Sequence, residues 1–153
     1  MKKFRYRMEN ILQIKLKLEE QAKNVYSTAR LRLTREEEKL ENLELQKRSY
    51  EDQLRELRSS KLNLLEIRRC EEAIDIMKLK IEQQIQVVKE AEKRLELARI
   101  KLQNAMAERK TQEKLKEKAF EDYMLEYEAE EQKVADELNS FRYGNNMLGE
   151  EDA

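Results

Sequence analysis

Apolar side chains recur every three or four residues over most of the chain, which is the spacing of one face of an α-helix. In the first segment, the positions that follow this spacing are Phe4, Met8, Ile11, Lys15, Leu18, Ala22, Val25, Ala29, Leu33, Glu36, Leu40, Leu43, Lys47, Tyr50, Leu54 and Leu57. Two consecutive steps of four, from Val25 through Ala29 to Leu33, predict a stutter that locally unwinds a coiled coil. The pattern therefore predicts one long helix that is nearly straight around residues 29–36.

A second segment shows a more regular heptad. One core position holds Ile74, Ile81, Val88, Leu95 and Leu102, and the other holds Met77, Gln84, Ala91, Ala98 and Ala105. Large aliphatic side chains beside alanine favour the close approach of two helices. The apolar spacing is then lost at Arg109, Gln112 and Lys116 and returns at Ala119 and Tyr123.

Residues 58–64 are the weakest helix formers of the chain, because Ser and Asn side chains compete for backbone hydrogen bonds. They predict a reversal at about 59–65 between helices over about 3–58 and 66–143, with Ser60 or Asn63 as the cap. One unbroken helix remains the alternative, since neither Gly nor Pro marks the turn. Gly144 is expected to end the second helix and to leave a flexible tail over 144–153.

Composition supports this all-α interpretation. Charged residues make up 42% of the chain, Pro is absent, and both Gly residues follow the last periodic segment. Disorder is excluded because 39% of the residues are hydrophobic and their spacing is periodic. The predicted fold is a long two-helix antiparallel coiled-coil hairpin that forms one domain over 1–153 and has no globular core.

Several classes of function are disfavoured. A net charge of −1 argues against a nucleic-acid partner. No apolar run reaches the roughly 18 residues of a transmembrane segment, and we expect no export signal, because Met8-Glu9-Asn10 interrupts any apolar core. The single cysteine, Cys70, fits a reducing compartment and is expected to be an inert helix-surface or hairpin residue.

Catalysis is disfavoured as well. The chain has no His, no second Cys and no glycine-rich phosphate loop, so we expect no enzyme, no catalytic residue, no cofactor and no metal site. The acidic runs at 36–38 and 130–131 are interpreted as solvated helix faces.

Charge and aromatic residues single out one end of the hairpin. Four cations lie within the first eight residues, and residues 120–138 carry eight Asp or Glu against one Lys. A reversal near residue 62 would place Phe4 opposite about residue 121, so these stretches should face each other. Seven of the nine aromatic residues lie at this end, at 4, 6, 120, 123, 127, 141 and 143. They either close the open end of the coil or form a partner-binding tip.

Three sequence features support a resemblance to a known family. They are the start Phe4-x-Tyr6-Arg7-Met8-x-x-Ile11-Leu12; Tyr50 and Leu54 before the weak reversal; and the C-terminal pattern Arg109-Lys110-x-x-Glu113-Lys114-Leu115-x-Glu117-Lys118, Tyr123, Glu131-Gln132-Lys133, Asp136-Glu137. In these features the chain resembles the FliJ family of flagellar type III export components, over essentially its whole length. The irregular seam at 109–116 is the departure from the family.

The resemblance implies a cytoplasmic hairpin similar to the central-stalk gamma subunit of rotary ATP synthases, peripherally associated with the inner-membrane export apparatus. Its implied partners are the hexameric flagellar export ATPase, the cytoplasmic domain of the export gate, and export chaperones. The predicted ATPase contacts are Lys3, Arg5, Tyr6, Arg7, Arg109, Lys110, Lys114, Tyr123 and Tyr127. By position, the implied gate contacts are Leu43, Gln46, Tyr50, Ala73 and Met77, for which plain coil core is the alternative.

Two other functions stay open at this point. One is a stalk subunit of a different rotary ATPase, such as a vacuolar-type enzyme. The other is a generic structural coiled coil that oligomerises through its seam.

Overall fold

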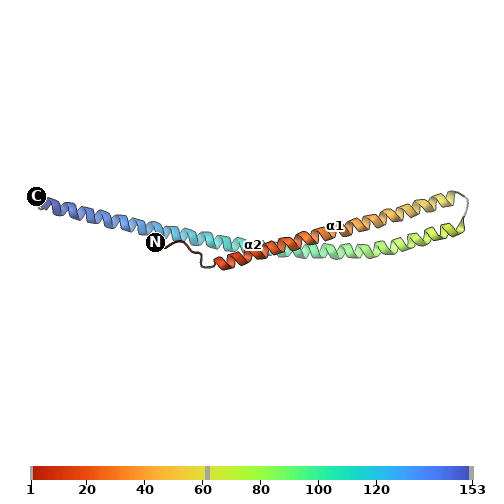
Figure 1. Ribbon diagram of the computed structural model, residues 1–153, viewed down its shortest axis with the longest axis horizontal. Coiled ribbons are helices and arrows are strands. Elements are labelled where there is room, and N and C mark those ends of the chain that lie inside the picture. Colours follow the sequence, from red (N-terminus) through yellow and green to blue (C-terminus); the bar gives the residue numbers. More distant parts are fainter. Residues whose placement is uncertain (1, 61–62, 152–153) are drawn as a thin grey trace. The chain divides into compact units, whose positions relative to one another are not determined.

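The computed structural model describes residues 2–60 and 63–151. Two helices account for most of them: α1 spans Glu9–Ser59 (51 residues) and α2 spans Leu64–Glu151 (88 residues), as Figure 1 shows. The described part of the chain contains no strand. The protein is all-α, and α1 packs on α2 as a helical hairpin, which confirms the predicted fold class.

The chain forms two compact units. We call Glu19–Ala105 the turn unit, and Met1–Leu18 with Met106–Ala153 the terminal unit. In each of them, contacts move backwards along α2 as they move forwards along α1, so the helices are antiparallel. Contacting pairs are Glu36–Gln84 and Tyr50–Cys70 in the turn unit, and Glu9–Lys116 and Lys15–Glu108 in the terminal unit.

The heptad predicted for the second segment forms the seam of the turn unit. Buried and half-buried side chains recur along α2 at 70, 74, 77, 81, 84, 88, 91, 95, 98, 102 and 105. Ala91 and Ala98 are among the most buried apolar residues of the described chain. Small side chains at these positions let the two helix backbones approach each other closely.

The seam of α1 differs from its prediction over residues 11–26. The structure exposes the predicted members Ile11, Leu18 and Val25 and instead buries, fully or in part, Leu12, Glu19 and Tyr26. From Leu12 to Leu57 the seam positions alternate steps of three and four without interruption. The predicted stutter is therefore wrong.

The predicted and observed seams of α1 differ because a seam depends on which face of the helix points toward its partner. An apolar stripe read from sequence follows the apolar residues, whereas the seam follows the 3.5-residue repeat that keeps one face toward the partner helix. A polar residue in phase, such as Glu19, is retained in the seam, and its apolar neighbour Leu18 is left exposed.

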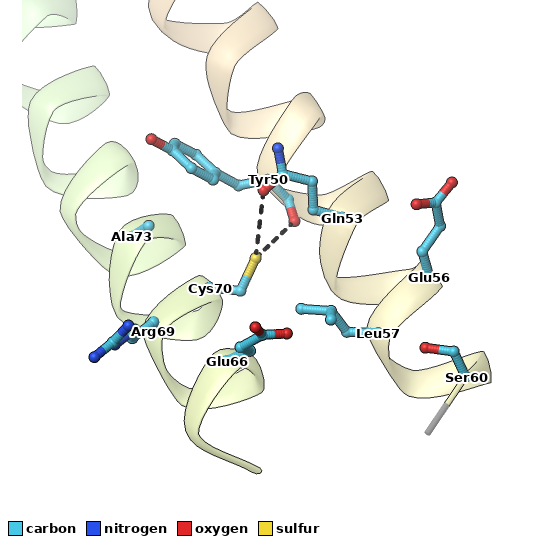
Figure 2. Close-up of a pocket in the computed structure, with 9 residues that line it drawn as sticks. All are labelled: Tyr50, Gln53, Glu56, Leu57, Ser60, Glu66, Arg69, Cys70 and Ala73. Atoms are coloured by element: carbon cyan, nitrogen blue, oxygen red, sulfur yellow. Dashed lines mark hydrogen bonds between the residues drawn. The ribbon is translucent and has the colours of Figure 1, made fainter. Parts of the chain in front are cut away.

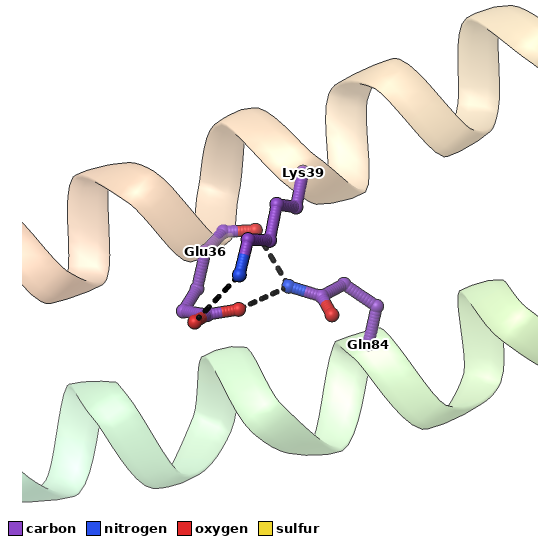
Figure 3. A network of polar contacts seen from close by, with 3 residues as sticks. All are labelled: Glu36, Lys39 and Gln84. Atoms are coloured by element: carbon purple, nitrogen blue, oxygen red, sulfur yellow. Dashed lines mark hydrogen bonds and ion pairs between the residues drawn. The ribbon is translucent and has the colours of Figure 1, made fainter.

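Glu36 shows how a polar residue is accommodated in the turn unit. Glu36 is only 8% exposed, so the interpretation of residues 36–38 as a solvated face is wrong for Glu36. Glu37 and Glu38 are exposed, as that interpretation expects. The Gln84 amide donates to the Glu36 carboxylate at 2.6 Å and to the Glu36 carbonyl oxygen at 2.9 Å (Figure 3). Lys39 adds an ion pair at 3.5 Å. The hydrogen bond from Gln84 lowers the pKa of Glu36, and the charge of Lys39 acts in the same direction.

The reversal lies where the weak helix formers predicted it. α1 ends at Ser59 and α2 begins at Leu64, which excludes one unbroken helix. Asn63 caps α2, since its side-chain oxygen accepts a hydrogen bond from the Glu66 amide at 3.4 Å. The Ser59 hydroxyl donates to the Glu56 carbonyl at 2.9 Å at the end of α1.

The outer helix ends differ from their predicted positions. Residues 2–8 are not helical, so α1 begins at Glu9 instead of residue 3. Gly144 does not end α2, which continues to Glu151. A single glycine costs a helix only about 1 kcal/mol, and Gly144 does not have the positive φ of a helix-ending residue. That the whole chain acts as one domain stays a prediction.

A matched pair of variants tests the seam of α1. Leu12 is 5% exposed and its neighbour Ile11 is 40% exposed. Leu12→Ala should lower the free energy of unfolding by about 2–3 kcal/mol, because it removes buried methyl groups and leaves a cavity, whereas Ile11→Ala should cost less than about 1 kcal/mol. Chemical denaturation followed by circular dichroism measures both. Equal losses would support the apolar stripe predicted from sequence.

Acidification tests the Glu36–Gln84 contact. A carboxyl whose folded pKa is lowered adds stability above its ordinary pKa of 4.5, and this stability is lost as the pH falls through the lower folded value. The melting temperature of Gln84→Leu should therefore lie furthest below wild type near pH 7, and the gap should narrow in acid. Gln83→Leu, at an exposed neighbouring position, is the control. If the difference in melting temperature between Gln84→Leu and wild type does not change with pH, the Glu36 carboxylate is not the group through which Gln84 stabilises the fold.

Candidate functional site

Four aromatic rings gather in the terminal unit, where the non-helical N-terminal segment lies against α2. The Phe4 ring meets Phe120 edge-on with centroids 5.2 Å apart and lies 5.4 Å from Tyr123. Tyr123 is 6.3 Å from both Phe120 and Tyr127. Positions 120, 123 and 127 share one face of α2 because they are three and four residues apart. We call these four residues the aromatic cluster; it confirms the predicted pairing of Phe4 with α2 near residue 121.

Two hydrogen bonds hold the same segment. The Tyr6 hydroxyl donates to Gln112 Oε1 at 2.9 Å, and the Tyr123 hydroxyl donates to the Lys2 carbonyl at 2.8 Å. Residues 2–6 have no regular secondary structure, so these contacts with α2 hold the segment in place.

The stretch of α2 in which the apolar spacing is lost still forms the seam. Arg109, Gln112 and Lys116 are all half-buried, in phase with the seam on either side. Lys116 pairs with Glu9 at 2.9 Å, and this contact lowers the pKa of Glu9. Arg109 pairs with Glu113 at 2.8 Å. Polar contacts thus replace apolar ones here, while the three-four spacing of half-buried positions along α2 continues.

All nine predicted ATPase contacts belong to the terminal unit. Lys3, Arg5, Arg7, Lys110 and Lys114 are exposed, and Tyr6, Arg109, Tyr123 and Tyr127 are half-buried. A surface groove brings together Lys3, Arg5, Tyr6, Arg7 and Tyr123, whereas the other four residues do not line it. The predicted set is therefore only partly one site.

This groove has walls of opposite charge. The N-terminal segment supplies the cations, and α2 supplies Asp122, Glu126 and Glu130. Nearby, the Glu131 carboxylate raises the pKa of Tyr127 by accepting a hydrogen bond from its hydroxyl. The predicted juxtaposition of the basic start with the acidic stretch is confirmed. Phe4 and Phe120 were missing from the predicted contacts, although the three-four spacing of Phe120, Tyr123 and Tyr127 was visible in the sequence.

The five predicted gate contacts lie in the turn unit. Tyr50 and Ala73 line a pocket beside the reversal, which Figure 2 shows. The register of the hairpin places Leu43 opposite Met77; Leu43 is half-buried, Met77 is buried, and both are seam positions. Of the five residues, Gln46 is exposed, Met77 is buried, and Leu43, Tyr50 and Ala73 are half-buried.

Cys70 is buried in the same region. Its Sγ lies 3.5 Å from the Tyr50 carbonyl oxygen and 4.0 Å from Gln53 Oε1, to which it donates weak hydrogen bonds (Figure 2). Of the two expectations for this cysteine, the helix-surface one is wrong, and it is a residue of the hairpin interior.

In the described ranges, 2–60 and 63–151, no group of three or more Cys, Asp or Glu side chains could hold a metal ion. No helix in these ranges combines the length and the apolar character that crossing a membrane requires.

Comparison with known proteins decides the family. The family model described as "Flagellar FliJ protein" matches residues 4–148. The chain belongs to the FliJ family. Among solved structures, it is similar to a Chlamydia trachomatis protein described as a YscO homolog, with a TM-score of 0.61 and 22% sequence identity over 95% of this chain and 99% of that one. No curated protein sequence matches it.

Membership in the FliJ family indicates a component of a flagellar or type III export apparatus. The family is one of structural export components and is not known for catalysis. The similar solved structure supports the helical-hairpin fold.

Limited proteolysis tests the aromatic cluster of this FliJ-family chain. Phe4→Ala removes ring contacts of about 1 kcal/mol, so trypsin should cleave after Arg5 and Arg7 about fivefold faster than in wild type. Phe141→Ala, at an exposed position of α2, is the control and should leave the rate unchanged. Mass spectrometry of the early fragments gives both rates. Equal rates for Phe4→Ala and wild type would mean that the rings do not hold the segment.

Proposed function

We propose that this chain is the central-stalk-like component of the flagellar export apparatus, and that its terminal unit binds the hexameric export ATPase and promotes its assembly and activity. The observation that carries the proposal is the groove of the terminal unit. There, Lys3, Arg5 and Arg7 surround aromatic rings that α2 holds in place. Aromatic anchors with arginine nearby are typical of the energetic centres of protein interfaces.

The nature of this contact follows from its exposure. The three cations of the N-terminal segment are exposed, so their attraction to acidic groups on a partner is screened by salt over about 8 Å at physiological ionic strength. Such charges steer association and set orientation more than they add affinity. A stalk inside a ring needs contacts of this kind, since it must not lock the ring in one state.

The turn unit is proposed to contact the export gate and export chaperones. Gln46 is the exposed member of the gate set, and the half-buried Tyr50 and Ala73 line the pocket at the reversal. Leu43 and Met77 would act indirectly, by holding the helix register on which these side chains depend. The chain would then work in the cytoplasm, peripherally associated with the inner-membrane export apparatus.

The other two functions are weaker candidates. A stalk subunit of another rotary ATPase and a generic coiled coil both fit a helical hairpin. The family match over residues 4–148 favours the export role over either.

Nucleotide hydrolysis by the export ATPase of the same organism tests the proposed contact. Arg5→Ala/Arg7→Ala should raise the concentration of this protein that gives half-maximal stimulation by about three- to tenfold, because two exposed charge contacts are lost. Lys89→Ala/Lys93→Ala removes the same charge from exposed positions of the turn unit and should leave stimulation unchanged. Added salt should weaken stimulation by wild type.

The proposed gate contact is tested by a separate binding measurement. Gln46→Ala/Tyr50→Ala should weaken binding to the purified cytoplasmic domain of the export gate and spare ATPase stimulation. If this variant abolishes stimulation while Arg5→Ala/Arg7→Ala leaves it intact, the two units have been assigned to the wrong partners.

A further inference from the structure

The turn unit carries an apolar groove with a basic rim. Its floor is formed by Val25 and Ala29 of α1 and by Leu97 and Ala98 of α2. Leu97 is 60% exposed, although it is a large aliphatic residue. The charged residues of the lining are Arg32, Arg94 and Lys101, all exposed, and no acidic side chain lines the groove. We call this surface the basic groove.

The terminal unit carries a surface of opposite character. On α2, a hollow is lined by Val134, Ala135 and Leu138 together with Glu130 and Glu131, and Tyr127 lies at its edge. Leu138 is 53% exposed. We call this surface the acidic stripe.

In the described part of the terminal unit, no other segment covers the acidic stripe. The N-terminal segment contacts α2 only as far as the groove that ends at Glu130, and every described side chain of α2 from 131 to 143 is exposed. An uncovered row of aliphatic and aromatic side chains on a soluble helix marks an interaction site.

The two surfaces match in three respects. Each presents two large exposed aliphatic side chains, and the cations of one correspond to the carboxylates of the other. Residues 24–32 of the groove and 130–138 of the stripe each span roughly 12 Å at 1.5 Å per residue. A helix that docks in the basic groove would become a third helix of the coiled coil, and the exposed aliphatic side chains of both surfaces would be buried.

We propose that the acidic stripe of one chain docks in the basic groove of a second copy of the same chain. The contact joins different surfaces of the two copies. Two chains that engage reciprocally form a closed two-fold dimer, whereas a one-way contact is heterologous and lets further chains add in series. The basic-groove cations are not among the residues proposed to bind the ATPase. On the other surface, Tyr127 is one of those residues and Glu130 also lines the groove of the terminal unit. The charge reversal in the basic groove therefore tests the contact between copies separately from the ATPase contact.

Sedimentation velocity over a range of protein concentrations at low salt tests this contact. Wild type should self-associate, and Arg94→Glu/Lys101→Glu or Glu130→Lys/Glu131→Lys should each weaken self-association at least about tenfold by placing like charges together. The chain that carries all four substitutions restores opposite charges and should associate again. Glu37→Lys/Glu38→Lys makes the same charge change at exposed positions outside both surfaces and should associate like wild type.

Circular dichroism of each variant shows that the helices are retained. A wild-type chain that stays monomeric at every concentration overturns the proposal. So does association that survives either charge reversal, or a fourfold variant that does not recover. Mixing the two reversed variants should also restore association, since the reversed groove of one is complementary to the reversed stripe of the other.

Discussion

One stripe of α1, with positions three and four residues apart, is buried against one stripe of α2, and this packing holds the hairpin together. The hairpin has no globular interior, and in the described part of the chain no large side chain is completely removed from water. Stability is therefore the sum of many half-buried layers, each of modest worth. A helix of this kind must keep every layer in phase, because a residue out of phase faces solvent whatever its hydrophobicity.

This constraint explains the polar members of the seam. Burying an unpaired carboxylate or ammonium group is unfavourable, so a charge that falls in phase requires a partner. Glu36 has the Gln84 amide and Lys39, and Lys116 has Glu9. The Glu36–Gln84 and Glu9–Lys116 contacts join the two helices, so they select one register among those that apolar layers alone would allow.

The terminal unit solves a different problem. Its first residues are not helical and cannot contribute a regular seam, so aromatic rings and hydroxyl groups of α2 hold them in place. A segment held by a few side chains, and bearing exposed cations, is easier to rearrange on a partner than a continuous helix. This gives a physical reason for an export component of the FliJ family to present its charged residues there.

The helical class, the position of the reversal, the heptad of α2, and the juxtaposition of basic and acidic ends all follow from the amino-acid sequence. Those features depend on local propensity, on periodicity and on charge, which can be read residue by residue. The packing of the two helices, in contrast, places Leu12 and Glu19 in the seam, leaves Ile11 and Leu18 outside it, and buries Glu36. The tertiary structure also decides which predicted contacts share a groove. These outcomes depend on the phase of one helix relative to its partner and on partners distant in sequence, because a side chain's own hydrophobicity does not specify which helix face meets the other helix.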